Sequence, residues 1–144
     1  MPPALETLPK GHHFPPIEFD LSPQWVREYV AAVEDKAIGR LGEDMVPPMA
    51  VAALSIRALL DAADLPAGAV HLGQELAFLR PLRAGERLSA RARVASRGER
   101  QGWAMMSIEL DVHDSAGRPV MTGRATVTMP VGEEPSTKNL EPNQ

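Results

Sequence analysis

The stretch that decides the fold is PPMAVAALSIRALLDAA at residues 47–63, which predicts a helix that is apolar on nearly every side. Two prolines open it, and proline suits the first turn of a helix because its missing N–H would be unpaired there anyway. Between Met49 and Leu60 the only charged residue is Arg57. A helix with so little polar surface is normally buried. Small residues would let a sheet approach it closely: Ala50, Ala52, Ala53 and Ser55.

The chain downstream of this helix alternates between apolar and polar residues with a period of two. Three segments separated by polar turns show the alternation: 87–97, 103–113 and 119–129. A period of two predicts β-strands, and polar residues on one face predict an antiparallel sheet with one covered face. Residues 70–80 are a fourth expected strand, with Leu72, Leu76 and Phe78 on one face and His71 on the other.

The residues before the long helix predict a short strand, a first helix and a loop. The strand is expected near 17–20, and Ser22 followed by Pro23 is typical of a helix start. Glycines then interrupt the helical spacing, so 35–46 is expected to be a loop. A long apolar helix followed by antiparallel strands predicts an α+β fold of the hot dog type, with the sheet wrapped around the helix. A sheet of another topology stays open.

Composition limits the classes of function. The 144 residues carry a net charge of 15 − 19 = −4 and no cysteine, which excludes disulfides, thiolate metal sites and a cysteine nucleophile. With this charge we expect no nucleic-acid partner. The longest uncharged run, Met45 to Ile56, is too short to span a bilayer, and the N-terminus lacks an apolar signal core, so we expect a cytoplasmic protein without a membrane partner. One domain, 14–129, is expected between tails at 1–13 and 130–144.

Two blocks of sequence resemble the MaoC-like dehydratase family, in particular its N-terminal-type hot dog domains. They are HLGQELAFLRPLRAGERLSARARV at 71–94 and YVAAVEDKAIGR at 29–40, and the order of motifs extends the resemblance over roughly residues 17–129. The resemblance implies (R)-specific hydration of an enoyl thioester, or dehydration of a 3-hydroxyacyl thioester, in fatty acid metabolism. The acyl carrier would be CoA or acyl carrier protein, and no cofactor is implied.

The family's catalytic loop carries an aspartate and, five residues later, a histidine. Asp35 falls at the position of the aspartate, but Arg40 stands where the family has its histidine. Arginine is not deprotonated in proteins, so it cannot act as the base. The resemblance therefore implies a degenerate subunit with an incomplete catalytic pair. Such a subunit would complete the acyl pocket of another hot dog subunit, as a homodimer or a heterodimer.

Other residues are candidates for substrate binding. In the family, a backbone N–H at the start of the buried helix polarises the thioester carbonyl, which implies a role for Pro48, Met49 and Ala50. Arg57 could hold a carboxylate or phosphate, or it could simply pair with Asp61. His71 is a further candidate for lining the pocket. The alternative is that it makes a structural hydrogen bond. No metal site is expected, since His12 and His13 have no third ligand nearby.

Two other functions stay open on the sequence alone. One is a hot dog thioesterase, which needs a carboxylate near the buried helix to direct water, and Glu43 and Asp44 are the candidates. The other is a structural or acyl-CoA-binding protein without activity. A basic row along one strand (Arg87, Arg91, Arg93 and Arg97) is expected to pair with Glu109 and Asp111 across the sheet rather than to bind CoA.

Overall fold

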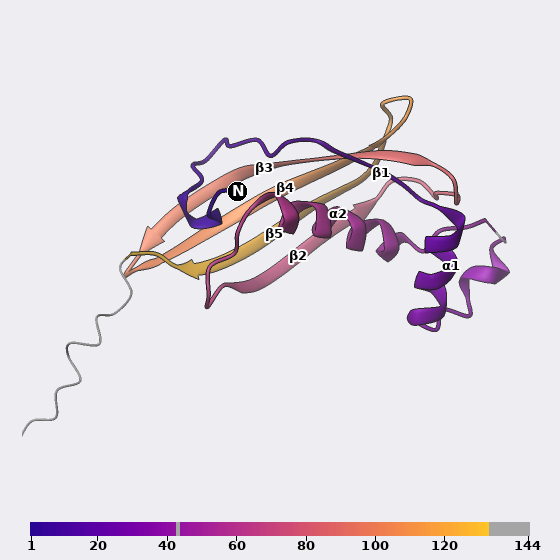
Figure 1. Cartoon of the computed structure of the whole chain (residues 1–144), viewed down its shortest axis with the longest axis horizontal. Helices are drawn as coiled ribbons and strands as arrows, with labels where there is room; N and C mark the ends of the chain where they lie inside the picture. Colours follow the sequence, from indigo (N-terminus) through magenta and orange to yellow (C-terminus); the bar gives the residue numbers. More distant parts are fainter. Residues whose placement is uncertain (43, 133–144) are drawn as a thin grey trace, which may run out of the picture.

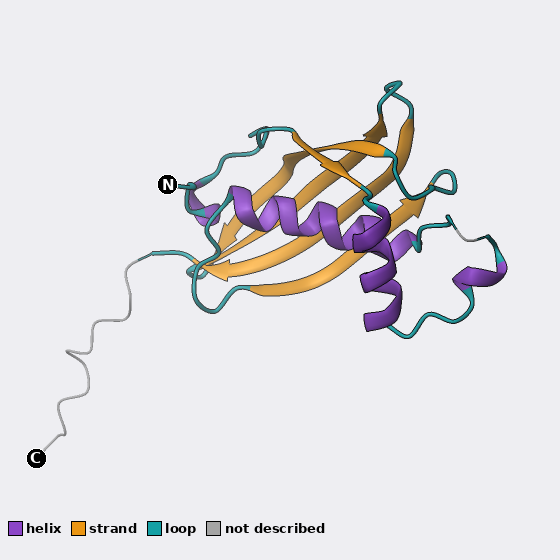
Figure 2. Ribbon diagram, turned by 45° about the vertical axis from the view of Figure 1, so that its right-hand side comes forward, coloured by secondary structure: helices purple, strands orange, loops and turns teal. Residues whose placement is uncertain are grey.

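The protein is an antiparallel sheet that curves around one long helix (Figures 1 and 2). The computed structural model describes residues 1–42 and 44–132. Its five strands run in the order β1-β3-β4-β5-β2. The elements are η1 (Leu5–Thr7), β1 (Ile17–Asp20), α1 (Pro23–Ala32), η2 (Ile38–Arg40), α2 (Pro48–Ala62), β2 (Val70–Phe78), β3 (Arg87–Arg100), β4 (Trp103–Asp114) and β5 (Pro119–Pro130). This architecture confirms the predicted α+β hot dog fold.

The helices begin where their capping residues predict. The Oγ of Ser22 accepts a hydrogen bond from the N–H of Trp25 at 3.1 Å, and Pro23 follows as the first residue of α1. Proline likewise opens α2 at Pro48. In both helices, the proline lies in the first turn, where its missing N–H leaves no donor unpaired and its ring fixes the backbone direction.

The long helix α2 is buried on one side only. Ala50, Val51, Ala52 and Ser55 are buried, as expected for three of the four small residues, whereas Ala53 is exposed. The Oγ of Ser55 donates to the carbonyl of Val51 at 2.8 Å, which satisfies the hydroxyl inside the core. On the other side, Leu60 is 49% exposed. The expectation of burial on nearly every side was therefore too broad, and one flank of α2 is uncovered in the described chain.

The two faces of the sheet separate apolar from charged residues. Buried residues alternate along β3 and β4 on the face that meets α2, while the opposite face carries ion pairs. There Glu109 accepts hydrogen bonds from both Arg93 and Arg124. Arg93 thus pairs with Glu109 as predicted, whereas Arg87 pairs with Glu18 and Asp20, and Arg97 with Glu99.

Strand β2 lies at an edge of the sheet and, among the described residues, pairs only with β5. The register shifts between His71 and Gly73, so that His71 pairs with Val127 and Gln74 pairs with Ala125. This β-bulge reverses the facing of His71 and Leu72 that a strict period of two predicts. His71 lies on the face of the sheet that meets α2, and Leu72, at the bulge, is 53% exposed. The predicted facing was wrong because the sequence pattern does not reveal the bulge.

The N-terminal residues pack against the body of the protein. Leu5 and Leu8 are buried, and the N–H of Leu5 donates to the carbonyl of Asp64 at 2.8 Å. Farther along, the N–H of Gly11 donates to the carbonyl of Val94 at 2.8 Å. This segment therefore joins the end of α2 to β3. At the other terminus, β5 ends at Pro130, and most of the expected C-terminal tail lies outside the described residues.

Candidate functional site

An apolar cavity of about 280 Å³ lies between the C-terminal half of α2 and strands β2, β4 and β5. Its rim and floor differ in exposure. Exposed residues form the rim: Leu60, Leu65, Val70 and His71. The floor is buried, with Leu5 at 4%, Ala63 at 4% and Ile108 at 2% exposure. A cavity with an accessible apolar rim and a closed floor is suited to a flexible hydrocarbon chain.

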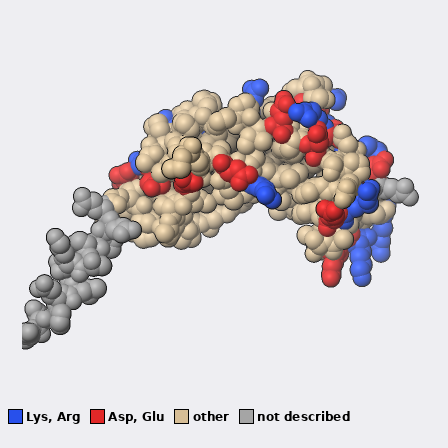
Figure 3. Space-filling view, in the orientation of Figure 1, with Lys and Arg blue, Asp and Glu red and all other residues tan. Residues whose placement is uncertain are grey.

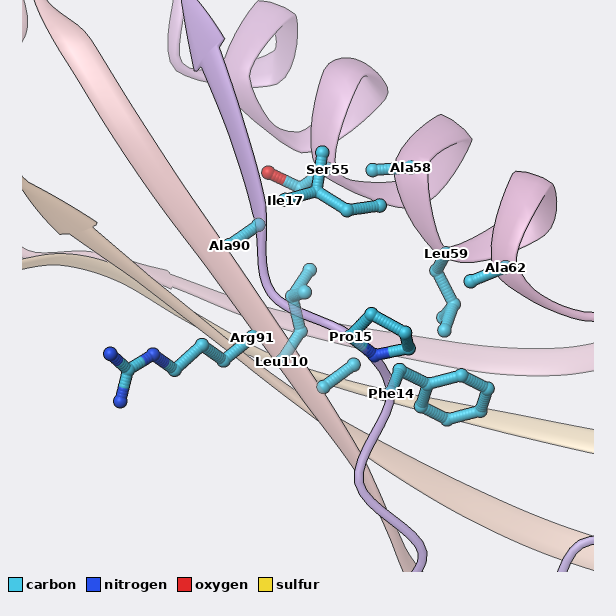
Figure 4. A pocket seen from close by; sticks show the side chains of 11 residues that line it. Phe14, Pro15, Ile17, Ser55, Ala58, Leu59, Ala62, Ala90, Arg91 and Leu110 are labelled. Carbon is cyan, nitrogen blue, oxygen red and sulfur yellow. The ribbon is translucent and has the colours of Figure 1, made fainter.

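The opposite flank of α2 is filled by side chains, which shows that the cavity is specific to the β2 side. Figure 4 shows this filled flank, where Phe14 and Pro15 insert between α2 and the sheet near Ala90. The remaining space there is about 10 Å³, room for at most one water molecule. The N-terminal segment therefore packs one side of α2 to the usual density of a protein core, while the other side stays hollow.

A single amide interrupts the apolar wall of the cavity on β2. The Nε2 of Gln74 donates to the carbonyls of Glu75 at 3.1 Å and Arg124 at 3.2 Å. Two carbonyl acceptors identify that atom as the amide nitrogen, so the remaining atom is the oxygen. This Oε1 is buried and has no hydrogen-bond partner among the described residues.

The loop that resembles the family's catalytic loop does not form an acid–base pair. The Oδ1 of Asp35 accepts hydrogen bonds from the N–H groups of Ala37 at 3.1 Å and Ile38 at 3.2 Å. Asp35 thus closes a turn that leads into η2, where Arg40 is exposed. Within the described chain the two side chains do not form an ion pair with each other. The carboxylate acts here as a turn cap.

The loop and the cavity lie at opposite ends of α2. Figures 1 and 2 both show α1 and the loop after it projecting beyond the end of the sheet, next to the start of α2. The cavity is lined by the C-terminal half of the helix. With 15 residues at about 1.5 Å each, α2 is about 22 Å long. Within one chain, Asp35 therefore lies away from the cavity by much of the length of α2.

The start of α2 offers few free donors for a thioester carbonyl. Pro48, the first helical residue, has no N–H. The N–H of Ala50 donates to the carbonyl of Pro47 at 2.9 Å. Of the first three helical residues, Met49 alone can have an unengaged N–H. Pro48, Met49 and Ala50 do not line the cavity. Together they offer at most one free backbone N–H to a thioester carbonyl.

The remaining candidate residues divide between the cavity and the surface. His71 lines the rim of the cavity beside Val70, whereas Arg57 is exposed on α2 and does not line it. Of the two thioesterase candidates, Glu43 lies outside the described residues. Asp44 is exposed, and its backbone carbonyl accepts a hydrogen bond from the N–H of Ala84 at 2.7 Å. The described residues therefore do not place a water-directing carboxylate in the cavity.

The strongest pKa shift in the described chain belongs to a structural carboxylate. The N–H of Arg118 and the guanidinium of Arg80 lower the pKa of Asp114 from 3.8 to about 2, and the N–H of Ala116 adds to the effect. Arg80 also bonds Glu86 at 2.8 Å. This network ties the end of β4 to the segment between β2 and β3. It lies outside the lining of the cavity, so we assign it to the fold.

Two further residues of the cavity, Gln74 and Leu5, differ in how visible they are in the sequence. Gln74 shares its strand face with Leu76 and Phe78, and a polar residue at an inward position is a signal that the alternating pattern contains. Leu5 gives no such signal, because the N-terminal residues show no periodicity. Its place in the floor follows from the contact between the N-terminal segment and the end of α2.

The fold defines a hot dog protein, and comparison with known families gives the family itself. Residues 9–123 match the FAS1-like dehydratase domain region, and the chain belongs to this family. The resemblance of 29–40 and 71–94 to dehydratases is confirmed. No helix in the described part of the chain is long and apolar enough to cross a membrane.

Other proteins are similar to this chain in sequence or in fold. The chain is 28% identical over 149 residues to a UPF0336 protein of Streptomyces avermitilis, covering 91% of this chain and 99% of that protein. The C-terminally truncated HadBC (3R-hydroxyacyl-ACP dehydratase) complex from Mycobacterium tuberculosis is similar in structure, with TM-score 0.68 and 24% identity over 87% of this chain and 100% of that one. A MaoC-like dehydratase from Rhodospirillum rubrum gives TM-score 0.71 and 19% identity over 91% and 99%. At these identities the two structures show the shared fold.

Proposed function

We propose that this protein is the acyl-binding, non-catalytic subunit of a hot dog dehydratase or hydratase that acts on 3-hydroxyacyl or enoyl thioesters. The observation that carries the proposal is the loop of Asp35 and Arg40. Hydration needs one group to take a proton from water and another to handle the proton at the α carbon. Here the family's histidine is an arginine, and the aspartate caps a turn.

The cavity supports a role in holding the acyl chain. Its lining is apolar apart from His71 and Gln74, which suits the hydrocarbon of an acyl thioester. A methylene group takes about the space of a water molecule, roughly 30 Å³, so the cavity would hold about nine.

The open edge of the sheet supports association with another hot dog subunit. Strand β2 has a partner on one side only, and four apolar residues at this edge are 41–53% exposed: Val70, Leu72, Phe78 and Leu79. In Figure 3 the surface over β2 and β5 carries few charged side chains. Unpaired edges of this kind are normally covered. The partner would contribute the aspartate and histidine that act on the thioester, and this chain would receive the acyl tail.

A binding measurement tests the role of the cavity. We expect the purified chain to bind decanoyl-CoA in a calorimetric titration, because its acyl chain matches the volume of the cavity. Ala125 lines the cavity on β5, and its replacement Ala125→Phe would fill the space and weaken binding at least tenfold. The matched control is Thr126→Phe, one residue along on the opposite face of the strand, which should bind like the wild type.

The alternatives give different results in the same preparation. Absence of heat with decanoyl-CoA and with its carrier-protein thioester would contradict the proposal. Release of free CoA thiol from decanoyl-CoA would identify a thioesterase instead. Equal loss of binding in both phenylalanine variants would place the acyl chain somewhere other than the cavity.

A further inference from the structure

We propose that the N-terminal segment sets the length of acyl chain that the cavity accepts, and that Leu5 is the residue that does so. The proposal rests on the proposed function, because it gives the cavity's floor a role in selecting the ligand. An apolar cavity alone does not imply that a segment outside α2 and the sheet selects the ligand. The inference follows from the part of the chain that forms the floor of this cavity.

The floor of the cavity is built from three separate parts of the chain. Ala63 comes from the end of α2, Ile108 from β4 and Leu5 from η1. Each is at most 4% exposed, whereas Val70 on the rim is 48% exposed. An acyl chain that enters from the rim would therefore end against these three side chains. Of the three, Leu5 is the residue that the N-terminal segment contributes, since Ile108 belongs to the sheet and Ala63 directly follows α2.

The backbone holds Leu5 in this position. Its N–H donates to the carbonyl of Asp64 at 2.8 Å, and the N–H of Asp64 donates to the carbonyl of Pro3 at 2.8 Å. A guanidinium nitrogen of Arg97 donates to the carbonyl of Glu6 at 2.7 Å, which ties the same segment to β3. These bonds fix the segment on both sides of Leu5. A floor held in this way would resist displacement by a longer chain.

The segment also contains a residue that matches Leu5 without touching the cavity. Leu8 is 5% exposed, against 4% for Leu5, and it belongs to the same N-terminal segment. It is absent from the lining of the cavity. Replacing either leucine by alanine removes the same buried atoms, so the two variants should lose similar stability. They should differ in their effect on chain length.

The experiment measures Kd for saturated acyl-CoAs from butanoyl to hexadecanoyl with the full-length chain. Leu5→Ala frees the space of about three carbon atoms, and we expect the tightest-binding chain to become about two carbons longer. Leu5→Phe should shorten it, because the ring occupies space at the floor. Each methylene newly buried or newly excluded should change Kd about fourfold. Leu8→Ala should keep the wild-type preference.

The outcomes separate this proposal from the one on which it rests. The same preferred chain length in wild type, Leu5→Ala and Leu5→Phe, with binding retained, would overturn the role of Leu5 and leave the acyl-binding function standing. The same shift in Leu5→Ala and Leu8→Ala would also overturn it, because a general loosening of the segment would then be the cause. Failure of the wild type to bind any acyl-CoA would overturn both proposals.

Discussion

At the scale of single residues, the most informative position is the loop carboxylate. A catalytic aspartate needs a side chain that can exchange a proton with a bound molecule. Asp35 instead has one oxygen bonded to two backbone N–H groups that begin the next turn. The arginine at position 40 keeps its proton at any physiological pH. These observations support the proposal that the loop is not catalytic in the isolated chain.

A second carboxylate makes the stability of the protein depend on acidity. The N–H of Arg118 and the guanidinium of Arg80 stabilise ionised Asp114, so its pKa falls from 3.8 to about 2. A lowered pKa in the folded state contributes stability above the ordinary value, and this contribution is lost as the pH falls through the folded value. The urea midpoint of the wild type should therefore decrease between about pH 4 and pH 2.

The variant Asp114→Asn should show a weaker dependence on pH in that window, because asparagine has no proton to gain. Its stability should also be lower at pH 7, since Arg80 loses a charged partner. Glu109→Gln is the control. It removes a carboxylate whose pKa is also lowered, by Arg124 and Arg93, but which lies on the exposed face of the sheet. A pH dependence in Asp114→Asn equal to that of the wild type would show that other groups control acid unfolding.

At the scale of elements, the edge strand β2 is the part of the sheet that we expect to associate. Leu72→Lys places a charge on this edge, where Leu72 is 53% exposed, and edge lysines oppose strand pairing. We expect the wild-type chain to self-associate and this variant to be monomeric, as measured by light scattering during gel filtration. The melting temperature should change little, because the side chain is not buried.

The control for the edge is Met105→Lys, which introduces the same charge at 54% exposure on the interior strand β4. This variant should keep the mass of the wild type. A monomeric wild type, or an unchanged mass in Leu72→Lys, would contradict self-association through β2.

Periodicity predicted most of the elements but not the features that shape the cavity. The alternation of residues placed the inward face of β3 and β4, and the prolines placed the start of α2. The β-bulge at 71–73 could not be predicted, because it depends on pairing with β5 rather than on the residues of β2 alone. The N-terminal segment could not be predicted either. Its burial comes from long-range backbone bonds such as that between Leu5 and Asp64.

The candidate site was predicted less fully than the fold. Asp35 and Arg40 were found because the loop resembles a family motif, and the structure adds that the carboxylate is used in a turn. His71 lies at the rim of the cavity, on the strand face opposite to the predicted one, and its role in substrate binding stays a prediction. Arg57 was chosen for being the lone charge on its helix, which is a weak signal because a long side chain can reach solvent from a half-buried helix.

At the scale of the whole molecule, the apolar cavity and the loop of Asp35 and Arg40 occupy opposite ends of one helix. In the proposed function, the chain holds an acyl tail at one end of α2, while a partner subunit supplies the proton-transfer pair. Association through β2 would bring a second hot dog subunit to the open side of the cavity. The catalytic pair of that subunit would complete the site, and this chain would supply the space for the tail.

The measurement that tests this account most directly is hydration of crotonyl-CoA by the purified chain alone, followed by the loss of the enoyl-thioester absorbance. The variant Asp35→Asn, which keeps a side-chain oxygen to cap the turn, is assayed in parallel. We predict that neither protein gives turnover above the uncatalysed reaction. Turnover by the wild type that disappears in Asp35→Asn would show that Asp35 is catalytic without a histidine, and it would contradict the assignment of this chain as a non-catalytic subunit.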